Sequence, residues 1–322
     1  MTLPLKHRFI LFASTMAMLF TTSGCDLIYE DLPPCPEEQL QLVFNWSEVG
    51  DPTFIPPEGM TTLYYPTDGS DYWRYETDPD SAKIDLPYNA YNILAMNNDT
   101  RSINHFDIES YNGALVFTLG STIIETVFRV KDGAEPPHPD VSQPLRQQAD
   151  MMYVADHGDT IHDIHDNNLR VTLYPRQFTP NYKVIVDSIG NLGSISVASF
   201  ALSGLAGAKY LVTGERIETP VTLPGNLAVS GPQQLSGNVV SFGPSPGSYK
   251  NFLCIYVWLR NGEKFVYMFD VTDQIASSPD QMNLTIRVGG FSLPDIPSGG
   301  GNIGNINIGI DNWINVDIDL NN

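Results

Sequence analysis

The chain has 322 residues, of which 37 are acidic and 17 are basic, so its formal net charge at pH 7 is −20. A negative charge of this size repels nucleic acid and anionic lipid headgroups, which excludes both as expected partners. A hydrophobic content of 42% excludes a disordered chain, and the length indicates two domains.

The first 25 residues have the pattern of an export signal. Lys6 and Arg8 precede an apolar run at residues 9–20, which is shorter than the roughly 20 residues of a membrane-spanning helix. Small residues then lead to Cys25. This pattern resembles the lipobox of bacterial lipoproteins, in which residues 1–24 are removed and the cysteine carries the lipid. The alternative is a plain cleaved secretory signal, and either one takes the chain out of the cytoplasm.

Residues 25–38 form an acidic, proline-rich stretch, which we expect to be a tether between the membrane and the folded part. From residue 39 onward, apolar and polar residues alternate with a period of two, and turn residues often interrupt the pattern. This combination predicts short antiparallel strands and argues against a βαβ fold. The strands of the first half are expected at residues 40–46, 61–65, 72–75, 84–86, 91–96, 103–108 and 115–119.

One turn in this half is specified by its residues. Asp68 and Gly69 form a dipeptide that favours a tight hairpin turn. A two-residue loop at this dipeptide would place Tyr64 opposite Trp73.

A change of composition divides the chain near its middle. Residues 131–144 are rich in proline and poor in apolar residues, which places the expected domain boundary after Pro144. A short helix is expected at residues 143–150. Alternating patterns then predict strands at residues 169–174, 182–187, 195–202 and 208–212. The sequence therefore predicts an all-β fold of two tandem antiparallel β-sandwich domains, at residues 39–144 and 145–298.

A second hairpin is expected at residues 252–271, with its turn at Asn261 and Gly262. Both of its faces are apolar, so we expect a central pair of strands that is covered on both sides. In a two-residue register the facing pairs would be Arg260–Glu263, Trp258–Phe265, Tyr256–Tyr267 and Cys254–Phe269. This row of aromatic rings is expected to pack in a core, and a sugar-stacking platform is the alternative.

The C-terminal tail combines glycines with a strand pattern. Residues 299–309 contain five glycines, which predict a flexible lead. No strand-then-helix pattern surrounds them, so they do not indicate a phosphate-binding loop. Ile314, Val316, Ile318 and Leu320 then alternate with polar residues and predict a terminal strand. We expect this strand to complete the chain's own second domain, and donation to a neighbouring molecule is the alternative.

One stretch is rich in potential metal ligands. The candidates in it are His157, His162, His165, Asp159 and Asp163. Zinc needs three or four donors that converge, whereas on a strand His162 and His165 point to opposite faces. We therefore expect a solvated acidic connection between strands, with no metal bound.

The remaining reactive residues form no catalytic pattern. No nucleophile elbow, Cys–His pairing or dinucleotide fingerprint occurs, so we expect neither enzymatic activity nor a cofactor. Cys35 lies in the proline-rich lead and Cys254 in an apolar strand pattern, so separate thiols are expected. A disulfide between them is the alternative, because spacing alone does not show that they approach.

Several stretches carry a resemblance to a known group. They are the Cys25 lead with residues 32–36 (LPPCP), residues 86–100 (LPYNAYNILAMNNDT), 171–184 (VTLYPRQFTPNYKV), 202–214 (LSGLAGAKYLVTG) and 269–275 (FDVTDQI). The chain resembles the two-domain surface lipoproteins of Bacteroidota, a group that includes fimbrial anchors, minor subunits and members of undefined function. The resemblance implies transthyretin-like or Ig-like sandwiches and outer-membrane anchoring through the lipid on Cys25, at the periplasmic face or the cell surface.

The function implied by the resemblance is structural or adhesive. It implies a non-enzymatic lipoprotein for fimbrial anchoring or assembly, with pilus subunits or other surface proteins as partners. The first alternative is a surface glycan-binding lipoprotein, for which Trp46, Trp73 and Tyr72 are the candidate aromatic residues. The second is a metal-dependent hydrolase that uses the stretch from His157 to Asp166.

Overall fold

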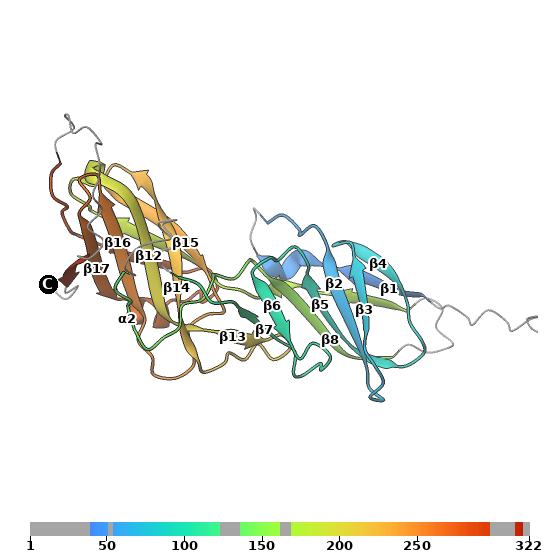
Figure 1. The fold of residues 1–322 in the computed structure, drawn as a ribbon. Coiled ribbons are helices and arrows are strands. Elements are labelled where there is room, and N and C mark those ends of the chain that lie inside the picture. The colour runs from blue at the N-terminus through green and yellow to red at the C-terminus, as the bar shows by residue number, and fades with distance from the viewer. Residues whose placement is uncertain (1–38, 51–53, 123–135, 162–168, 297–312, 318–322) are drawn as a thin grey trace, which may run out of the picture.

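The computed structural model describes residues 39–50, 54–122, 136–161, 169–296 and 313–317. The export signal, Cys25, Cys35, the tether and the glycine-rich lead lie outside these residues. Strands dominate the described part of the chain, which confirms the all-β fold. Figure 1 shows two sandwiches that lie end to end, with β6 (Ile103–Phe106), β7 (Leu115–Thr118) and β13 (Ala208–Tyr210) between them.

The helices of the described residues are all short. They are η1 (Trp46–Val49), η3 (Leu192–Ser194) and α2 (Thr272–Ala276). None of the helices in these ranges has the length and apolar character needed to cross a membrane.

The N-terminal sandwich has three layers. A five-stranded sheet in the order β10-β8-β5-β2-β3 forms the middle layer, between the sheets β4-β1-β9 and β13-β7-β6. Successive side chains of the middle sheet point to opposite faces, so this sheet packs against both outer sheets. Tyr64 and Ile93 pack toward the β4-β1-β9 sheet, whereas Leu63 and Leu94 pack toward Val116 of β7. The further strands are β1 (Gln39–Phe44), β2 (Met60–Pro66), β3 (Trp73–Thr77), β4 (Ser81–Asp85), β5 (Ala90–Asn97), β8 (Tyr153–Ile161), β9 (Arg170–Leu173) and β10 (Arg176–Gln177).

The C-terminal sandwich is a single folded sheet. Its eight strands have the order β18-β11-β15-β14-β12-β16-β17-β19. Strand β14 bends the sheet, because its first part pairs with β12 and its last four residues pair with β15. The two layers enclose one apolar core. The strands are β11 (Asn181–Asp187), β12 (Ile195–Ala206), β14 (Pro220–Gly231), β15 (Gln234–Val240), β16 (Phe252–Leu259), β17 (Lys264–Asp270), β18 (Thr285–Gly289) and β19 (Trp313–Asp317).

The division of the chain differs from the expected boundary after Pro144. Strands β8, β9 and β10 follow that residue, yet they pair with strands of the N-terminal sandwich. Ala155 of β8 lies opposite Ala95 of β5, and Val171 of β9 lies opposite Leu42 of β1. The fall in apolar content marks a crossing to the C-terminal sandwich, where the hydroxyl of Tyr256 donates to the carbonyl of Pro137 (2.6 Å). It does not mark the end of a domain, because strand pairing joins residues far apart in sequence.

The helix expected at residues 143–150 is wrong. Residues 144–149 are extended and lie between β14 and β15, where these two strands separate. The amide of Arg146 donates to the carbonyl of Thr222 on β14 (3.0 Å), and that of Ala149 donates to Val240 on β15 (3.1 Å). A helix would withdraw these backbone groups from both strands and leave the strand edges unsatisfied.

The hairpin of β16 and β17 has a different register from the expected one. The amide of Gly262 donates to the carbonyl of Leu259 (3.0 Å), and Gly262 has a φ of 91°, so the loop has three residues. This is the turn-plus-bulge alternative to a two-residue Asn-Gly turn. The pairs are Trp258–Lys264, Val257–Phe265, Tyr256–Val266, Ile255–Tyr267, Cys254–Met268 and Leu253–Phe269.

The shift by one residue changes which side chains share a face. Tyr267 and Phe269 point into the sandwich core, whereas Tyr256 and Cys254 pack on the outer face with Leu145. The expected single row of aromatic rings is therefore wrong. Burial on both faces of the hairpin is confirmed.

The terminal strand β19 pairs with its own chain. It runs parallel to β17, and Val316 lies opposite Tyr267. Trp313 makes an edge-on contact with Tyr256, with ring centroids 5.7 Å apart. The expectation that the strand completes its own domain agrees with this pairing, while Ile318 and Leu320 lie outside the described residues.

Truncation after Ser298 should therefore lower the melting temperature of the isolated protein and expose apolar surface. Loss of β19 uncovers the edge of β17 and the ring of Tyr256. Each kcal/mol of lost packing energy should lower the melting temperature by roughly 2–4 °C. Thermal unfolding with an apolar dye measures both effects. The full-length variant Ile314→Ala is the control, because that side chain is 44% exposed. If the truncated protein keeps the melting temperature of the full-length protein and loses only its assembly with a partner, the strand is instead donated to a neighbouring molecule.

Candidate functional site

The open side of the N-terminal sandwich lies at β3 and β4. Each of these strands is the last strand of its sheet, so within the described residues one row of its backbone groups has no strand partner. A groove of about 720 Å³ lies beside the two edges. Its charged lining residues are Glu58, Glu76, Asp78 and Lys83. An open strand edge is a ready site for a further extended segment.

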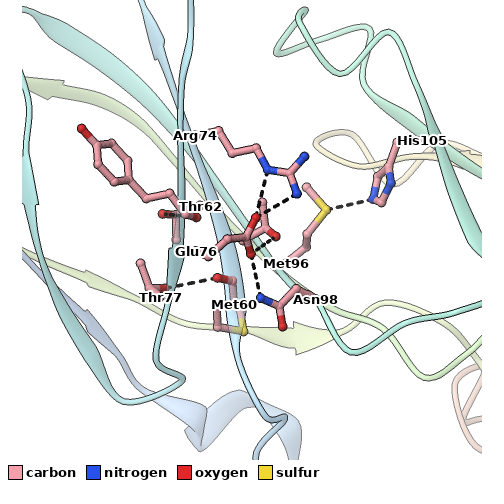
Figure 2. A network of polar contacts seen from close by, with 10 residues as sticks. Met60, Thr62, Arg74, Glu76, Thr77, Met96, Asn98 and His105 are labelled. Atoms are coloured by element: carbon pink, nitrogen blue, oxygen red, sulfur yellow. Dashed lines mark hydrogen bonds and ion pairs between the residues drawn. The ribbon is translucent and has the colours of Figure 1, made fainter.

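Glu76 anchors this edge to the neighbouring strands. Its Oε1 accepts hydrogen bonds from Nε and Nη2 of Arg74 at 3.0 and 2.8 Å, and its Oε2 accepts from Thr61 and Asn98, each at 2.7 Å. Figure 2 shows Arg74 and Asn98 converging on this carboxylate. The four bonds occupy both oxygens and tie β3 to β2 and to the end of β5.

The carboxylate of Glu76 is therefore unsuited to proton transfer. Burial raises the pKa of Glu76, but hydrogen bonds from Asn98, Thr61 and Arg74 outweigh it and hold the pKa below its ordinary value. The group stays ionised near neutral pH and has no free lone pair to accept a proton. The arrangement holds the edge in place and offers no general acid or base.

A smaller pocket of about 160 Å³ lies on the other face of the sheet, lined by Arg74, Met96 and His105 among others. His105 Nε2 is 3.2 Å from the sulfur of Met96 (Figure 2). Burial first, and the charge of Arg74 second, lower the pKa of His105. The imidazole is therefore neutral at pH 7, and the pocket presents Arg74 as its cation.

The structure separates the three expected sugar-binding aromatic residues. Trp46 packs against Phe54 and Tyr153 and donates its indole N–H to the carbonyl of Pro79 (2.9 Å), so it has a packing role. Tyr72 stacks on Tyr65 at 5.7 Å.

Trp73 remains as the candidate that faces solvent. It is 42% exposed and lies opposite Tyr64, as expected from the Asp68-Gly69 turn. Tyr75, two residues along β3 and so on the same face, lines the groove. Its hydroxyl donates to the carbonyl of Asp85 on β4 (2.5 Å), which links the two edges.

Part of the expected metal stretch lies on β8. His157 is exposed opposite Ile93, and the backbone of Asp159 continues the strand. His162, Asp163 and His165 lie outside the described residues. The described ranges hold no group of three or more potential ligands that could bind a metal.

Cys254 is a free thiol and is fully buried. Burial raises the pKa of Cys254 to about 12, and a hydrogen bond with Tyr256 offsets only part of this rise. A thiol with so high a pKa is inert as a nucleophile at neutral pH.

Comparison with known proteins relates this fold to a family and to solved structures. A family model described as Domain of unknown function (DUF5119) matches residues 25–225. A putative adhesin from Bacteroides ovatus ATCC 8483 has a TM-score of 0.59 and 15% identity, over 82% of this chain and 95% of that one. This similarity confirms the fold expected from the resemblance.

Two further structures are more distant. The fimbrial anchor protein Mfa2 from Porphyromonas gingivalis has a TM-score of 0.48 and 12% identity, with 78% and 90% of the two chains covered. A protein described as a putative polysaccharide binding protein from Bacteroides thetaiotaomicron has a TM-score of 0.48 and 9% identity, with 79% and 91% covered. No curated protein matches the sequence.

Proposed function

The chain belongs to the family described as Domain of unknown function (DUF5119), and we propose that it is a non-enzymatic, outer-membrane-anchored lipoprotein with a structural or adhesive role. The observation that carries this proposal is the pair of end-to-end sandwiches, which are similar over most of both chains to a putative adhesin. The apolar signal ending at Cys25 supports anchoring. Fimbrial anchoring or assembly is the specific role we propose.

The open edge of β3 is the surface we assign to a partner protein. The four bonds to Glu76 fix this edge before binding, which lowers the entropic cost of adding an extended segment. A pilus subunit or another surface protein would supply that segment. Lipid on Cys25 would supply the attachment to the membrane.

Photo-crosslinking on intact cells tests this assignment. A photoreactive phenylalanine analogue in place of Trp73 should give a covalent adduct with a surface protein. The same analogue in place of Val229, which is 67% exposed on the C-terminal sandwich, should give none. Equal adducts from both positions, or none from Trp73, would contradict the assignment. Stoichiometric metal in the purified protein would instead favour the hydrolase alternative.

The runner-up function is glycan binding at the same side of the sandwich. It is favoured by the exposed side chain of Trp73 and by a groove farther along β3, which is lined by Tyr75 and by three residues that carry carboxylates. A glycan array distinguishes the two functions, because the structural role requires no glycan.

Alanine substitutions separate the roles of the two tryptophans. Trp73→Ala should leave the melting temperature nearly unchanged, whereas Trp46→Ala should lower it, because Trp46 loses its contacts with Phe54 and Tyr153. If a glycan binds, Trp73→Ala should weaken binding roughly threefold to tenfold. Thermal unfolding and array titration measure the two effects. Unchanged glycan affinity in the Trp73 variant would remove the groove from the glycan-binding alternative.

A further inference from the structure

Two cations lie side by side where the sandwiches meet. The chain turns back after β13, and the amide of Ile217 donates to the carbonyl of Ala208 (3.0 Å). This register places Lys209 directly opposite Arg216. Side chains at directly opposed positions share one face, and like charges there are destabilising.

No acidic side chain of the described residues forms an ion pair with either cation. Lys209 Nζ donates to the carbonyl of Phe178 (2.8 Å) and lies 4.0 Å from the centroid of its ring. The guanidinium of Arg216 lies against Gly243, where a Cβ atom would be 3.0 Å from Nη1. Ion pairs form elsewhere in the described ranges, for example Arg74–Glu76, Arg176–Asp156, Lys250–Asp270 and Arg287–Asp187.

Neither cation has a carboxylate partner in the part of the chain that the structure describes, although the sequence has 37 acidic and only 17 basic residues. Burial, followed by the charges of Arg216 and Arg176, lowers the pKa of Lys209 to about 8. Most Lys209 side chains are therefore still protonated at pH 7. Both side chains are only partly buried, so a solute can reach them from the solvent.

A third polar group lies on β11, two residues beyond Pro180, which adjoins the same position at Gly243 as Arg216 does. This group is the hydroxyl of Tyr182, which is fully buried and has no hydrogen-bond partner among the described residues. Burial raises the pKa of Tyr182, and the charge of Arg216 partly offsets this rise. A buried hydroxyl without a partner costs free energy, and a bound acceptor would remove that cost.

We propose that Lys209 and Arg216 bind an oxyanion at the junction of the two sandwiches, with the hydroxyl of Tyr182 as a third donor. A guanidinium offers two parallel N–H groups and an ammonium offers a compact charge, which together suit a carboxylate, sulfate or phosphate group. The three donors come from β11 and from the β13 turn, so a bound anion would join the two sandwiches. This site goes beyond the adhesive or structural role and does not depend on it.

Isothermal titration of the exported chain with sodium phosphate, sulfate and acetate tests the proposal, with sodium chloride keeping the ionic strength constant. We expect saturable binding of at least one oxyanion at roughly millimolar concentration. Arg216→Gln and Lys209→Gln should each weaken it about tenfold. Lys250→Gln is the matched control, because Lys250 is exposed and pairs with Asp270 at 2.9 Å. Its affinity should equal that of the unmodified chain.

Tyr182→Phe keeps the test decisive if either cation variant fails to fold. It should weaken anion binding severalfold without lowering the melting temperature, because the hydroxyl makes no hydrogen bond with any described residue. Preference for acetate would point to a carboxylate-bearing ligand, and preference for phosphate or sulfate to a tetrahedral anion. No saturable binding up to about 50 mM, or equal binding by all variants, would overturn the proposal.

Discussion

Alanine in place of Cys25 should move the protein from the membrane fraction to the soluble fraction. In the proposed lipoprotein this one cysteine bears the acyl chains, and each buried CH₂ group contributes roughly 0.8 kcal/mol of membrane affinity. No helix among the described residues is long and apolar enough to cross a membrane. Fractionation and fatty-acid labelling of whole cells measure the result.

Cys35→Ala is the matched control for this prediction. Cys35 lies ten positions beyond Cys25 and outside the lipobox-like pattern, so this variant should remain lipidated and in the membrane fraction. If the Cys25 variant stays in the membrane fraction and the unmodified protein takes up no fatty acid, the lipoprotein assignment is wrong.

Phe200→Ala should produce the largest loss of stability among single core substitutions in the C-terminal sandwich. Phe200 is fully buried on β12, and its ring lies over two glycines, Gly225 of β14 and Gly237 of β15. The ring occupies the space that two missing Cβ atoms leave at the bend of the sheet. Removal of a buried phenylalanine ring costs about 3–5 kcal/mol, and the bent sheet has little freedom to close the cavity.

Urea denaturation followed by tryptophan fluorescence measures this loss. Val229→Ala on β14 is the control, because Val229 is 67% exposed and its truncation should change the free energy of unfolding by less than about 0.5 kcal/mol. If both variants unfold at the same urea concentration, the ring of Phe200 does not support the bend.

Local patterns predicted the strands well, because a half-buried strand must alternate in polarity. In β1, Leu40 and Leu42 are buried while Gln39 and Gln41 are exposed. The register of the second hairpin was wrong, because Asn261-Gly262 suits both a two-residue turn and a three-residue loop with a bulge at Gly262. A shift of one residue reverses every side chain of a strand.

Features that depend on distant pairing could not be predicted from the sequence. The extended form of residues 144–149 follows from the separation of β14 and β15, which no local pattern reveals. The four bonds around Glu76 join residues from three separate segments. Lys209 and Arg216 also become neighbours only through a turn whose length the sequence leaves open. Trp73 was identified from sequence, whereas its nominated neighbour Tyr72 packs against Tyr65.

For the export that we propose, the return of β8, β9 and β10 to the N-terminal sandwich sets the order in which the chain can fold. A chain that crosses a membrane unfolded emerges from its N-terminus, so β1 and β5 appear long before their partners β9 and β8. The layer formed with β13 waits for residues 208–210, about two thirds of the way along the 322 residues. Contacts between such distant segments slow folding, because large loops must close first. The early strands therefore spend most of the crossing with open edges, a period in which a periplasmic chaperone has the greatest opportunity to protect them.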